Sequence, residues 1–431
     1  MGVVDTNTLG ESAVSEANVG VQHSQGAMQP VRRWQVLERM RHRSQGRRLP
    51  CLVLDGGMAT ELERRGHDLS GVDAEEWSAS VLRRMPSDVV HVHRDYIEAG
   101  ADVVSTATYQ ARADLFARGV ELVDEAWRGV CDVDERNVRR RRPFCALSLG
   151  PYAAFLRDGS EYSGYRWGDL SRPQAAEKLS AFHAARVEAA LPWLRGEAAQ
   201  PDAAQSPRAS ADWILFETVP DALEAECIAR LMSTRPACRQ APWALSFQAR
   251  MDDGRGVLAA GESVAAAVDR VLSACSGDDE NERSWLANGN GPLYLGFNCC
   301  APQDIGGLLG ELTHCRHAVA RNYRARCQAP SSRPDMSPPP FLGWCVYPNS
   351  GERWDASRQR WTPSSDMIPL DSAGARHFWH KHLPEWRALG AALVGGCCRV
   401  GPTIIEALTR AVRSGDHERI QPDGQGCEYG V

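Results

Sequence analysis

Eight short apolar runs, separated by segments with helical periodicity, constrain the fold of this chain more than any other feature. Buried strands of this length that alternate with helices are typical of parallel βα units. Eight such units in a chain of 431 residues predict an α/β fold, a single closed (β/α)8 barrel of the TIM type, rather than an open sheet. The runs occupy residues 51–57, 101–108, 143–150, 213–217, 243–249, 293–300, 341–348 and 391–398.

The rhythm of strands and helices also sets the predicted domain limits. The barrel is predicted over 46–415, between a flexible leader over 1–45 that has few large apolar residues and a short tail over 416–431. Three stretches rich in small or polar residues, 196–212, 276–291 and 326–340, interrupt the rhythm. Each directly precedes a strand, so we expect insertions near the amino-terminal face of the barrel, without a catalytic part.

Charge and cysteine usage exclude several classes of protein. The formal net charge of −6 argues against binding to nucleic acid or to a membrane surface, and no apolar stretch is long enough to cross a bilayer. Fourteen cysteines are scattered through a long chain that lacks a recognisable signal peptide. We therefore expect reduced thiols and a cytoplasmic protein. The start Met1-Gly2 also fits the loose N-myristoylation pattern, which often matches by chance.

Polar and thiol-bearing residues gather where the predicted strands end. In a (β/α)8 barrel the carboxyl ends of the strands meet at one face, and the chemistry of such barrels is found there. This placement supports both the fold and a functional site at that face. The residues are Asp55, Thr106, Thr108, Glu217, Asn298, Cys299, Cys397 and Cys398.

The cysteines lie in two glycine-bearing segments, Gly-Phe-Asn-Cys-Cys at 296–300 and Gly-Gly-Cys-Cys-Arg at 395–399. Three thiolates from two strand ends would leave one position of a tetrahedral Zn²⁺ open, as in catalytic sites. An all-sulfur site with an open position suits a thiol substrate. The bland alternative is that these cysteines are small buried hydrophobes. Either Cys299 or Cys300 could face the barrel axis.

Two carboxylates, Asp55 and Glu217, end the first and fourth predicted strands. A buried carboxylate is costly without a cationic partner, and a substrate ammonium group would supply one. For Asp55 the alternative is a helix N-cap, because Gly56-Gly57 and a helix follow. Asn298, next to the first cysteine pair, is placed to hydrogen-bond a polar substrate or to support a metal ligand.

Nine short motifs together resemble the homocysteine S-methyltransferase family, and the resemblance covers about residues 50–412. Taken together, these motifs make a chance match implausible. They lie at 54–62, 77–79, 106–111, 150–152, 158–162, 216–218, 296–299, 347–351 and 395–399.

The resemblance implies methyl transfer to L-homocysteine, giving methionine, with one Zn²⁺ per chain held by Cys299, Cys397 and Cys398. It selects Cys299 over Cys300, because the cysteine of the family's GxNC motif falls on Cys299. By the same residue-wise match, Asp55 and Glu217 would hold the homocysteine amino group, and Thr106 would line the amino-acid site. Asn298 is predicted from its position to bind substrate as well. Tyr109 falls where some relatives place a residue that caps the open metal position.

The methyl donor implied by the resemblance is a sulfonium compound. The segment at 158–162 resembles members that use S-methylmethionine, with S-adenosylmethionine as a second donor and betaine as the main rival. The chain ends soon after the eighth strand, which argues against a cobalamin module. Two other interpretations stay open: a related thiol or selenol methyltransferase, and a non-catalytic barrel with a structural or redox-active cysteine cluster.

Overall fold

The computed structural model describes residues 33–43, 50–69, 78–131, 141–194, 209–238, 241–276, 291–315, 341–355 and 360–418. Every predicted apolar run in this part of the chain contains a strand. The strands are β1 (Leu52–Val53), β2 (Val103–Ser105), β3 (Phe144–Leu149), β4 (Trp213–Val219), β5 (Trp243–Phe247), β8 (Tyr294–Asn298), β9 (Gly343–Tyr347) and β12 (Ala391–Val394).

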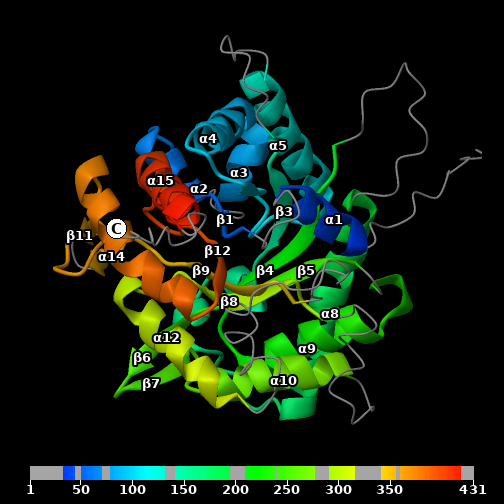
Figure 1. Ribbon diagram of the computed structural model, residues 1–431. Coiled ribbons are helices and arrows are strands. Elements are labelled where there is room, and N and C mark those ends of the chain that lie inside the picture. Colours follow the sequence, from blue (N-terminus) through cyan, green and yellow to red (C-terminus); the bar gives the residue numbers. More distant parts are fainter. Residues whose placement is uncertain are drawn as a thin grey trace, which may run out of the picture.

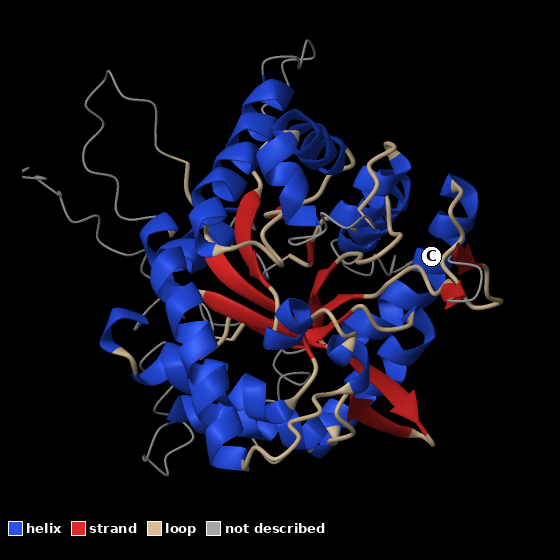
Figure 2. Ribbon diagram, turned by 180° about the vertical axis from the view of Figure 1, so that it is seen from behind, coloured by secondary structure: helices blue, strands red, loops and turns tan. Residues whose placement is uncertain are grey.

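These eight strands form one sheet in the order β1-β12-β9-β8-β5-β4-β3-β2. Every neighbouring pair is parallel. A further parallel bridge between Leu54, just after β1, and Val103 of β2 closes the sheet on itself. The structure thus confirms the predicted eight-stranded parallel barrel, and helices surround its strands in both views (Figures 1 and 2).

The helices follow the strands as expected for βα units, and several begin at clear capping residues. The side chain of Asp221 accepts hydrogen bonds from the first turn of its helix, and Asp371 does the same. The main helices are α2 (Met58–Arg64), α3 (Ser78–Arg84), α4 (Pro86–Glu98), α5 (Phe116–Cys131), α8 (Arg172–Ala190), α9 (Ala222–Thr234), α10 (Val264–Ser276), α12 (Ile305–Glu311), α14 (Ser372–Ala388) and α15 (Pro402–Glu418), with short helices α6 (Tyr152–Leu156) and α7 (Ser160–Ser163).

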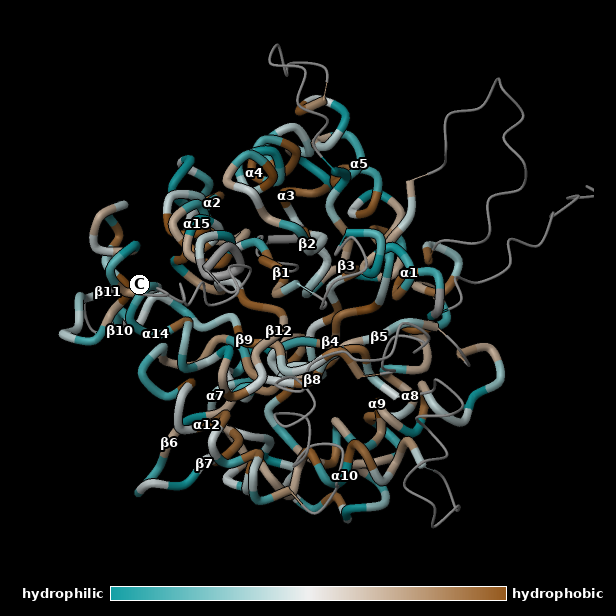
Figure 3. The backbone as a smooth tube through the Cα atoms, in the orientation of Figure 1, coloured by the Kyte–Doolittle hydropathy of each residue, from teal (hydrophilic) through white to brown (hydrophobic). Residues whose placement is uncertain are grey.

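Apolar side chains of the strands and of the inner helix faces form one continuous core. The barrel strands are fully buried along most of their length, which is why they appear in the sequence as continuous apolar runs rather than alternating ones. The hydropathy colouring shows apolar stretches along the central strands (Figure 3). No helix of the described residues is both long and apolar enough to cross a membrane.

The structure also has two antiparallel hairpins that the sequence did not predict, and they form separate two-stranded sheets. Strands β6 (Ala249–Asp252) and β7 (Arg255–Leu258) pair after β5, and β10 (Arg353–Asp355) pairs with β11 (Arg360–Thr362) after β9. The first hairpin turns at Asp253 and Gly254, which both have positive φ angles of 45° and 77°. An Asp-Gly turn of this kind suits a two-residue hairpin. Both hairpins leave the barrel at the carboxyl ends of its strands.

A helix lies within the segment that the sequence predicted to be a flexible leader. Helix α1 covers Arg33–Arg43, and its side chains Val36, Leu37 and Met40 are buried. Their spacing places these three apolar side chains on one face of the helix. Residues 33–43 therefore belong to the packed structure, a difference from the expectation, whereas 1–32 lie outside the described residues.

Helix α1 crosses the amino-terminal ends of the barrel strands. Arg33 donates hydrogen bonds to the carbonyl oxygens of Gly291 and Pro292, just before β8. Arg39 pairs with Asp212, just before β4, and Arg43 lies 3.6 Å from the carboxylate of Asp102, just before β2. The helix thus covers the face of the barrel opposite the one where the strands end.

Replacement of Arg39 with alanine is expected to destabilise the fold by about 3 kcal/mol, because it removes a cation that pairs with a buried carboxylate. The partner, Asp212, is almost fully buried and also accepts a hydrogen bond of 2.8 Å from the backbone N–H of Cys145. Urea denaturation measures the change. The matched control is Arg41→Ala on the exposed side of the same helix; equal stability of the two variants would contradict the prediction.

The predicted insertions are largely outside the described residues. Of the stretches 196–212, 276–291 and 326–340, the structure describes only the last residues of the first and the two ends of the second. The last helix, α15, continues to Glu418, three residues beyond the predicted barrel limit at 415. The remainder of the predicted tail, 419–431, also lies outside the described residues.

Candidate active site at the carboxyl ends of the strands

A cavity of about 880 Å³ opens where the barrel strands end. Six of the polar and thiol-bearing residues that the sequence places at strand ends line it, and they lie in β4 or just after β1, β2, β8 and β12. The structure therefore brings together side chains that are hundreds of residues apart in the chain. The six are Asp55, Thr106, Glu217, Cys299, Cys397 and Cys398.

The three cysteines form a compact cluster, and among the described residues it is the only group of three or more potential metal ligands of its kind. Their sulfur atoms all lie within 4.8 Å of one another. Cys299 Sγ is 3.5 Å from Cys398 Sγ, and Cys397 Sγ is 4.0 Å from Cys398 Sγ. The sulfurs of Cys299 and Cys397 are in disulfide contact, with their Cα atoms 5.5 Å apart.

The backbone decides which cysteine of the first pair faces the cavity. Strand β8 ends at Asn298, and Cys299 has a left-handed φ of 51°, which turns the chain sharply. Cys299 lines the cavity, whereas the sulfur of Cys300 lies 3.4 Å from the backbone nitrogen of Ala249. Burial raises the pKa of the Cys300 thiol to about 12. Cys300 is thus a packing residue, as expected from the choice of Cys299.

Close backbone contacts position the second cysteine pair. A Cβ atom on Gly396 would lie 2.1 Å from a methyl carbon of Val400, so only glycine fits there. The backbone N–H of Cys397 then donates to the carbonyl of Pro348 at 2.8 Å. Two adjacent cysteines point to one cavity because the strand has already ended at Val394. Burial raises the pKa of the Cys398 thiol to about 11.

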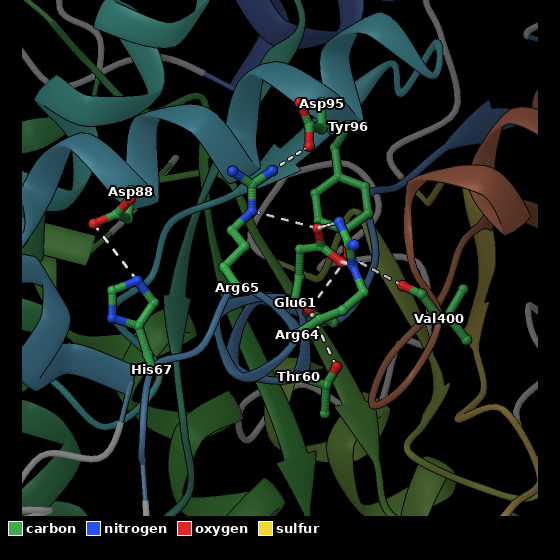
Figure 4. A network of polar contacts seen from close by, with 10 residues as sticks. Thr60, Glu61, Arg64, Arg65, His67, Asp88, Asp95, Tyr96 and Val400 are labelled. Carbon is green, nitrogen blue, oxygen red and sulfur yellow. Dashed lines mark hydrogen bonds and ion pairs between the residues drawn. The ribbon is translucent and has the colours of Figure 1, made fainter.

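A polar network behind the site joins the loop after β1 to the loop after Cys398 (Figure 4). The hydroxyl of Tyr96 on α4 lies 3.2 Å from the carbonyl of Gly57 and 3.1 Å from that of Val400. The backbone N–H of Arg399 donates to the Thr60 hydroxyl at 2.9 Å. These contacts hold the loop that carries Cys397 and Cys398 against the start of α2, and so fix the position of these two cysteines.

Asp55 is buried and is held by the neighbouring strand rather than used as a helix cap. It accepts hydrogen bonds from the backbone N–H of Ser105 at 2.8 Å and from its hydroxyl at 2.9 Å. The N-cap residue of α2 is Gly57, and no side chain caps this helix, so the capping alternative is not formed. Burial, together with the nearby charge of Glu217, raises the pKa of Asp55 well above its usual range.

Glu217 belongs to strand β4, and its side chain lines the same cavity. The hydroxyl of Ser148 on β3 donates a hydrogen bond to its carboxylate. Burial raises the pKa of Glu217 to about 7, and hydrogen bonds from Ser148 and Tyr347 oppose this rise. Neither Glu217 nor Asp55 forms an ion pair among the described residues. The cavity therefore offers two carboxylates to a cationic group.

The two other predicted substrate residues have different positions. Thr106 lines the cavity, and its hydroxyl accepts a hydrogen bond of 3.0 Å from the backbone N–H of Ser148. Asn298 is fully buried and does not line the cavity. Its amide oxygen accepts from the backbone N–H of Thr218 at 2.7 Å, and its amide nitrogen lies 3.9 Å from Cys397 Sγ. Asn298 thus contacts Cys397 from the buried side and does not reach the cavity.

The sequence did not single out the side chain that lies against the cysteine cluster. The hydroxyl of Tyr162 on α7 is 3.8 Å from Cys299 Sγ. Tyr109, expected near the open metal position, lines the cavity, but it forms no hydrogen bond with a cysteine of the described residues. Both motifs were visible in the sequence, but their loops cross the barrel mouth, and loop paths do not follow from strand counting.

Comparison with known proteins agrees with this picture. The family model described as homocysteine S-methyltransferase matches residues 52–412. Homocysteine S-methyltransferase 4 of Zea mays is 34% identical over 86% of this chain and 92% of its own length. A selenocysteine Se-methyltransferase of Brassica oleracea var. italica is 32% identical over 84% and 89%. The metallated crystal structure of the homocysteine methyltransferase MmuM from Escherichia coli has 28% identity and a TM-score of 0.53, covering 84% of this chain and 96% of that one.

The fold and the site define a (β/α)8-barrel enzyme with a thiol cluster and two carboxylates at its catalytic face. Among such barrels, this chain belongs to the homocysteine S-methyltransferase family, because the family model covers nearly all of the barrel and the curated relatives match over most of their length. The resemblance expected from the motifs is thereby confirmed.

Proposed function

We propose that this protein is a zinc-dependent methyltransferase that moves a methyl group from a sulfonium donor, S-methylmethionine or S-adenosylmethionine, to L-homocysteine and forms methionine. The observation that carries the proposal is that three cysteine sulfurs and two carboxylates meet in one cavity, and that neither carboxylate has an ion pair within the described part of the chain. Homocysteine has the complementary groups, a thiol at one end and an ammonium group at the other.

The donor set fits Zn²⁺. Tetrahedral Zn²⁺ with sulfur ligands at about 2.3 Å separates those sulfurs by about 3.8 Å. The two distances to Cys398 Sγ, 3.5 Å and 4.0 Å, bracket this value. Because Cys299 and Cys397 are in disulfide contact, both would have to be reduced to thiols before they could hold the ion. Cys299, Cys397 and Cys398 would hold the ion.

The ion would supply the positive charge that keeps a thiol substrate ionised at neutral pH. The other tasks belong to side chains of the chain itself. The carboxylates of Asp55 and Glu217 would bind the homocysteine ammonium group and so fix the direction of its thiol. Ser105 and Ser148 orient the two carboxylates through the hydrogen bonds described above. Asn298 supports Cys397 from the buried side.

The reaction is a single displacement that needs no general acid. A lone pair of the homocysteine thiolate forms the new S–CH₃ bond, while the donor's S–CH₃ bond breaks and its electron pair stays on the leaving sulfur. The sulfonium donor therefore leaves as a neutral thioether, and with S-methylmethionine both products are methionine. The protein contributes alignment of the two substrates, which accounts for a large share of the rate in such reactions.

An assay with separated donors tests the proposal. Reduced, zinc-loaded protein is incubated with homocysteine and with S-methylmethionine, S-adenosylmethionine or betaine, and methionine is measured. We expect turnover with a sulfonium donor and none with betaine. Absence of methionine with both sulfonium donors would contradict the proposed reaction. Selenocysteine is tested as the acceptor in parallel, because a relative of this chain is named a selenocysteine Se-methyltransferase.

A further inference from the structure

A short segment between β3 and α8 supplies residues that line the cavity but have no role in the proposed binding of homocysteine. Within residues 157–162, the side chains of Arg157, Glu161 and Tyr162 line the cavity. The Tyr162 hydroxyl is 3.8 Å from Cys299 Sγ, so the segment passes beside the thiol cluster. Asp55 follows β1 and Glu217 belongs to β4 instead. The cavity thus has a second set of charged side chains, on a different element.

Glu161 has a carboxylate that pairs with no cation among the described residues, although it accepts a hydrogen bond from its own backbone N–H. Its Oε2 atom is buried and makes no hydrogen bond, and no basic side chain of the described residues forms an ion pair with the carboxylate. Burial raises the pKa of Glu161, and the neighbouring charge of Asp158 raises it further. A partly buried carboxylate in this situation is costly unless a cation reaches it. A cationic ligand in the cavity would fill that role.

Arg157 offers the opposite charge a few residues earlier. It ends α6 in the left-handed conformation, with φ of 57°, and its side chain is exposed to the cavity. No ion pair of Arg157 with an acidic residue is present in the described part of the chain. A non-glycine residue in this conformation costs roughly 1 kcal/mol or more and persists where the surroundings hold it. A guanidinium group is well suited to bind a carboxylate with two parallel hydrogen bonds.

The chain on both sides of this segment is fixed by hydrogen bonds and close packing, which sets the positions of the Arg157 and Glu161 backbones. Glu224 of α9 accepts a hydrogen bond of 2.6 Å from the backbone N–H of Tyr152 and one of 2.5 Å from the hydroxyl of Tyr165. The Tyr165 hydroxyl in turn accepts from the N–H of Ala153 at 2.9 Å. Gly164 packs so closely on Ala260 that a Cβ atom there would lie 2.7 Å from its Cα.

We propose that Arg157 and Glu161 form the subsite for the methyl donor, with Glu161 facing the sulfonium charge and Arg157 binding the donor's α-carboxylate. The donor class is then an amino-acid sulfonium, which carries both charges. This inference rests on the proposed methyl transfer. The cavity of about 880 Å³ is in the size range of sites that hold more than one small substrate. These two residues determine the binding of the methyl donor, whereas Asp55 and Glu217 bind the acceptor, homocysteine.

Steady-state kinetics with both substrates varied tests the subsite. Glu161→Gln and Arg157→Gln are each expected to raise the KM for S-methylmethionine by about tenfold or more. The first variant removes the negative charge that faces the sulfonium group, and the second removes the charge-assisted hydrogen bonds to the donor's carboxylate. The KM for homocysteine should stay within about twofold. Arg157→Lys should restore part of the donor affinity. The controls are Arg166→Gln and Asp169→Asn, two exposed residues close by in the sequence that do not line the cavity.

A charge comparison assigns the two roles separately. Methionine, measured as an inhibitor competitive with S-methylmethionine at saturating homocysteine, has the carboxylate but lacks the sulfonium charge. In the parent protein S-methylmethionine should bind more tightly than methionine, and Glu161→Gln should abolish most of that difference. Arg157→Gln should weaken both ligands by the same factor. S-adenosylmethionine, the second sulfonium donor, should follow S-methylmethionine in each variant.

The outcomes separate this inference from the proposed function. If the parent protein makes no methionine from any sulfonium donor, the proposed function fails. If the parent turns over but Glu161→Gln and Arg157→Gln keep the parental donor KM, the function stands and the donor subsite is wrong. Thermal melting of the variants accompanies the kinetics, and a loss of folded protein is recognised there. Equal increases in both substrate KM values would also overturn the assignment.

Discussion

Replacement of Cys299 with alanine is expected to remove bound zinc and to reduce methyl transfer by more than about 100-fold. Loss of a residue that merely supports a metal ligand costs about 10- to 100-fold in affinity or activity, and loss of a ligand should exceed that range. Only two thiols, of Cys397 and Cys398, would remain near the ion. Zinc content per chain, measured by elemental analysis of the purified variant, checks the binding without reference to activity.

Cys300→Ala is the matched control for this prediction. It removes the same side chain one residue later, but Cys300 points to the backbone of Ala249 rather than into the cavity. We expect this variant to keep a full zinc content and parental activity, with a modest loss of stability from the small cavity left behind. If Cys299→Ala methylated homocysteine as well as the parent, or if Cys300→Ala lost its zinc, the assignment of ligands would be wrong.

The barrel was predictable because each of its strands is buried on both faces. Such strands give continuous apolar runs, and the parallel topology puts all their carboxyl ends at one face. Counting runs was therefore enough to place Asp55, Glu217 and the two cysteine pairs at one face, whereas the choice of Cys299 over Cys300 came from the family resemblance. The hairpin at β6 and β7 was missed although its Asp-Gly turn is a recognisable signal. The predicted fifth run includes only the first residue of this hairpin, Ala249.

Other features could not be deduced from local sequence because they depend on tertiary contacts. Helix α1 is short and rich in arginine. A helix of this length is stable only when its apolar face packs against other elements, here the amino-terminal ends of the barrel strands. Asn298 was expected to be near a substrate or a metal ligand, and its full burial follows from the way Thr218 and Ser246 surround it. The position of Tyr162 beside Cys299 depends on the path of a loop across the barrel mouth.

Replacement of Glu217 with glutamine is expected to raise the KM for homocysteine by about 10- to 100-fold, because one charged partner of the ammonium group is lost at about 1.5–3 kcal/mol. The pH dependence gives a second readout. The pKa of Glu217 is raised to about 7 by burial, so the side chain is neutral below this pH and cannot pair with the ammonium group. The kcat/KM for homocysteine should therefore rise as pH increases through about 7, and the variant should lack that rise.

Glu63→Gln is the control for Glu217→Gln, because Glu63 also lines the cavity but has the positive charge of Arg399 nearby. This control should keep both the homocysteine KM and the rise of kcat/KM near pH 7.

The free energy of unfolding, measured without substrate, should show the opposite pH dependence and fall as pH increases. Since the folded-state pKa of Glu217 is raised from 4.5 to about 7, its contribution to stability is present below about 4.5 and is lost as pH rises through 7. Glu217→Gln should remove this loss, and an unchanged stability profile together with a parental KM would show that Glu217 does not bind the acceptor.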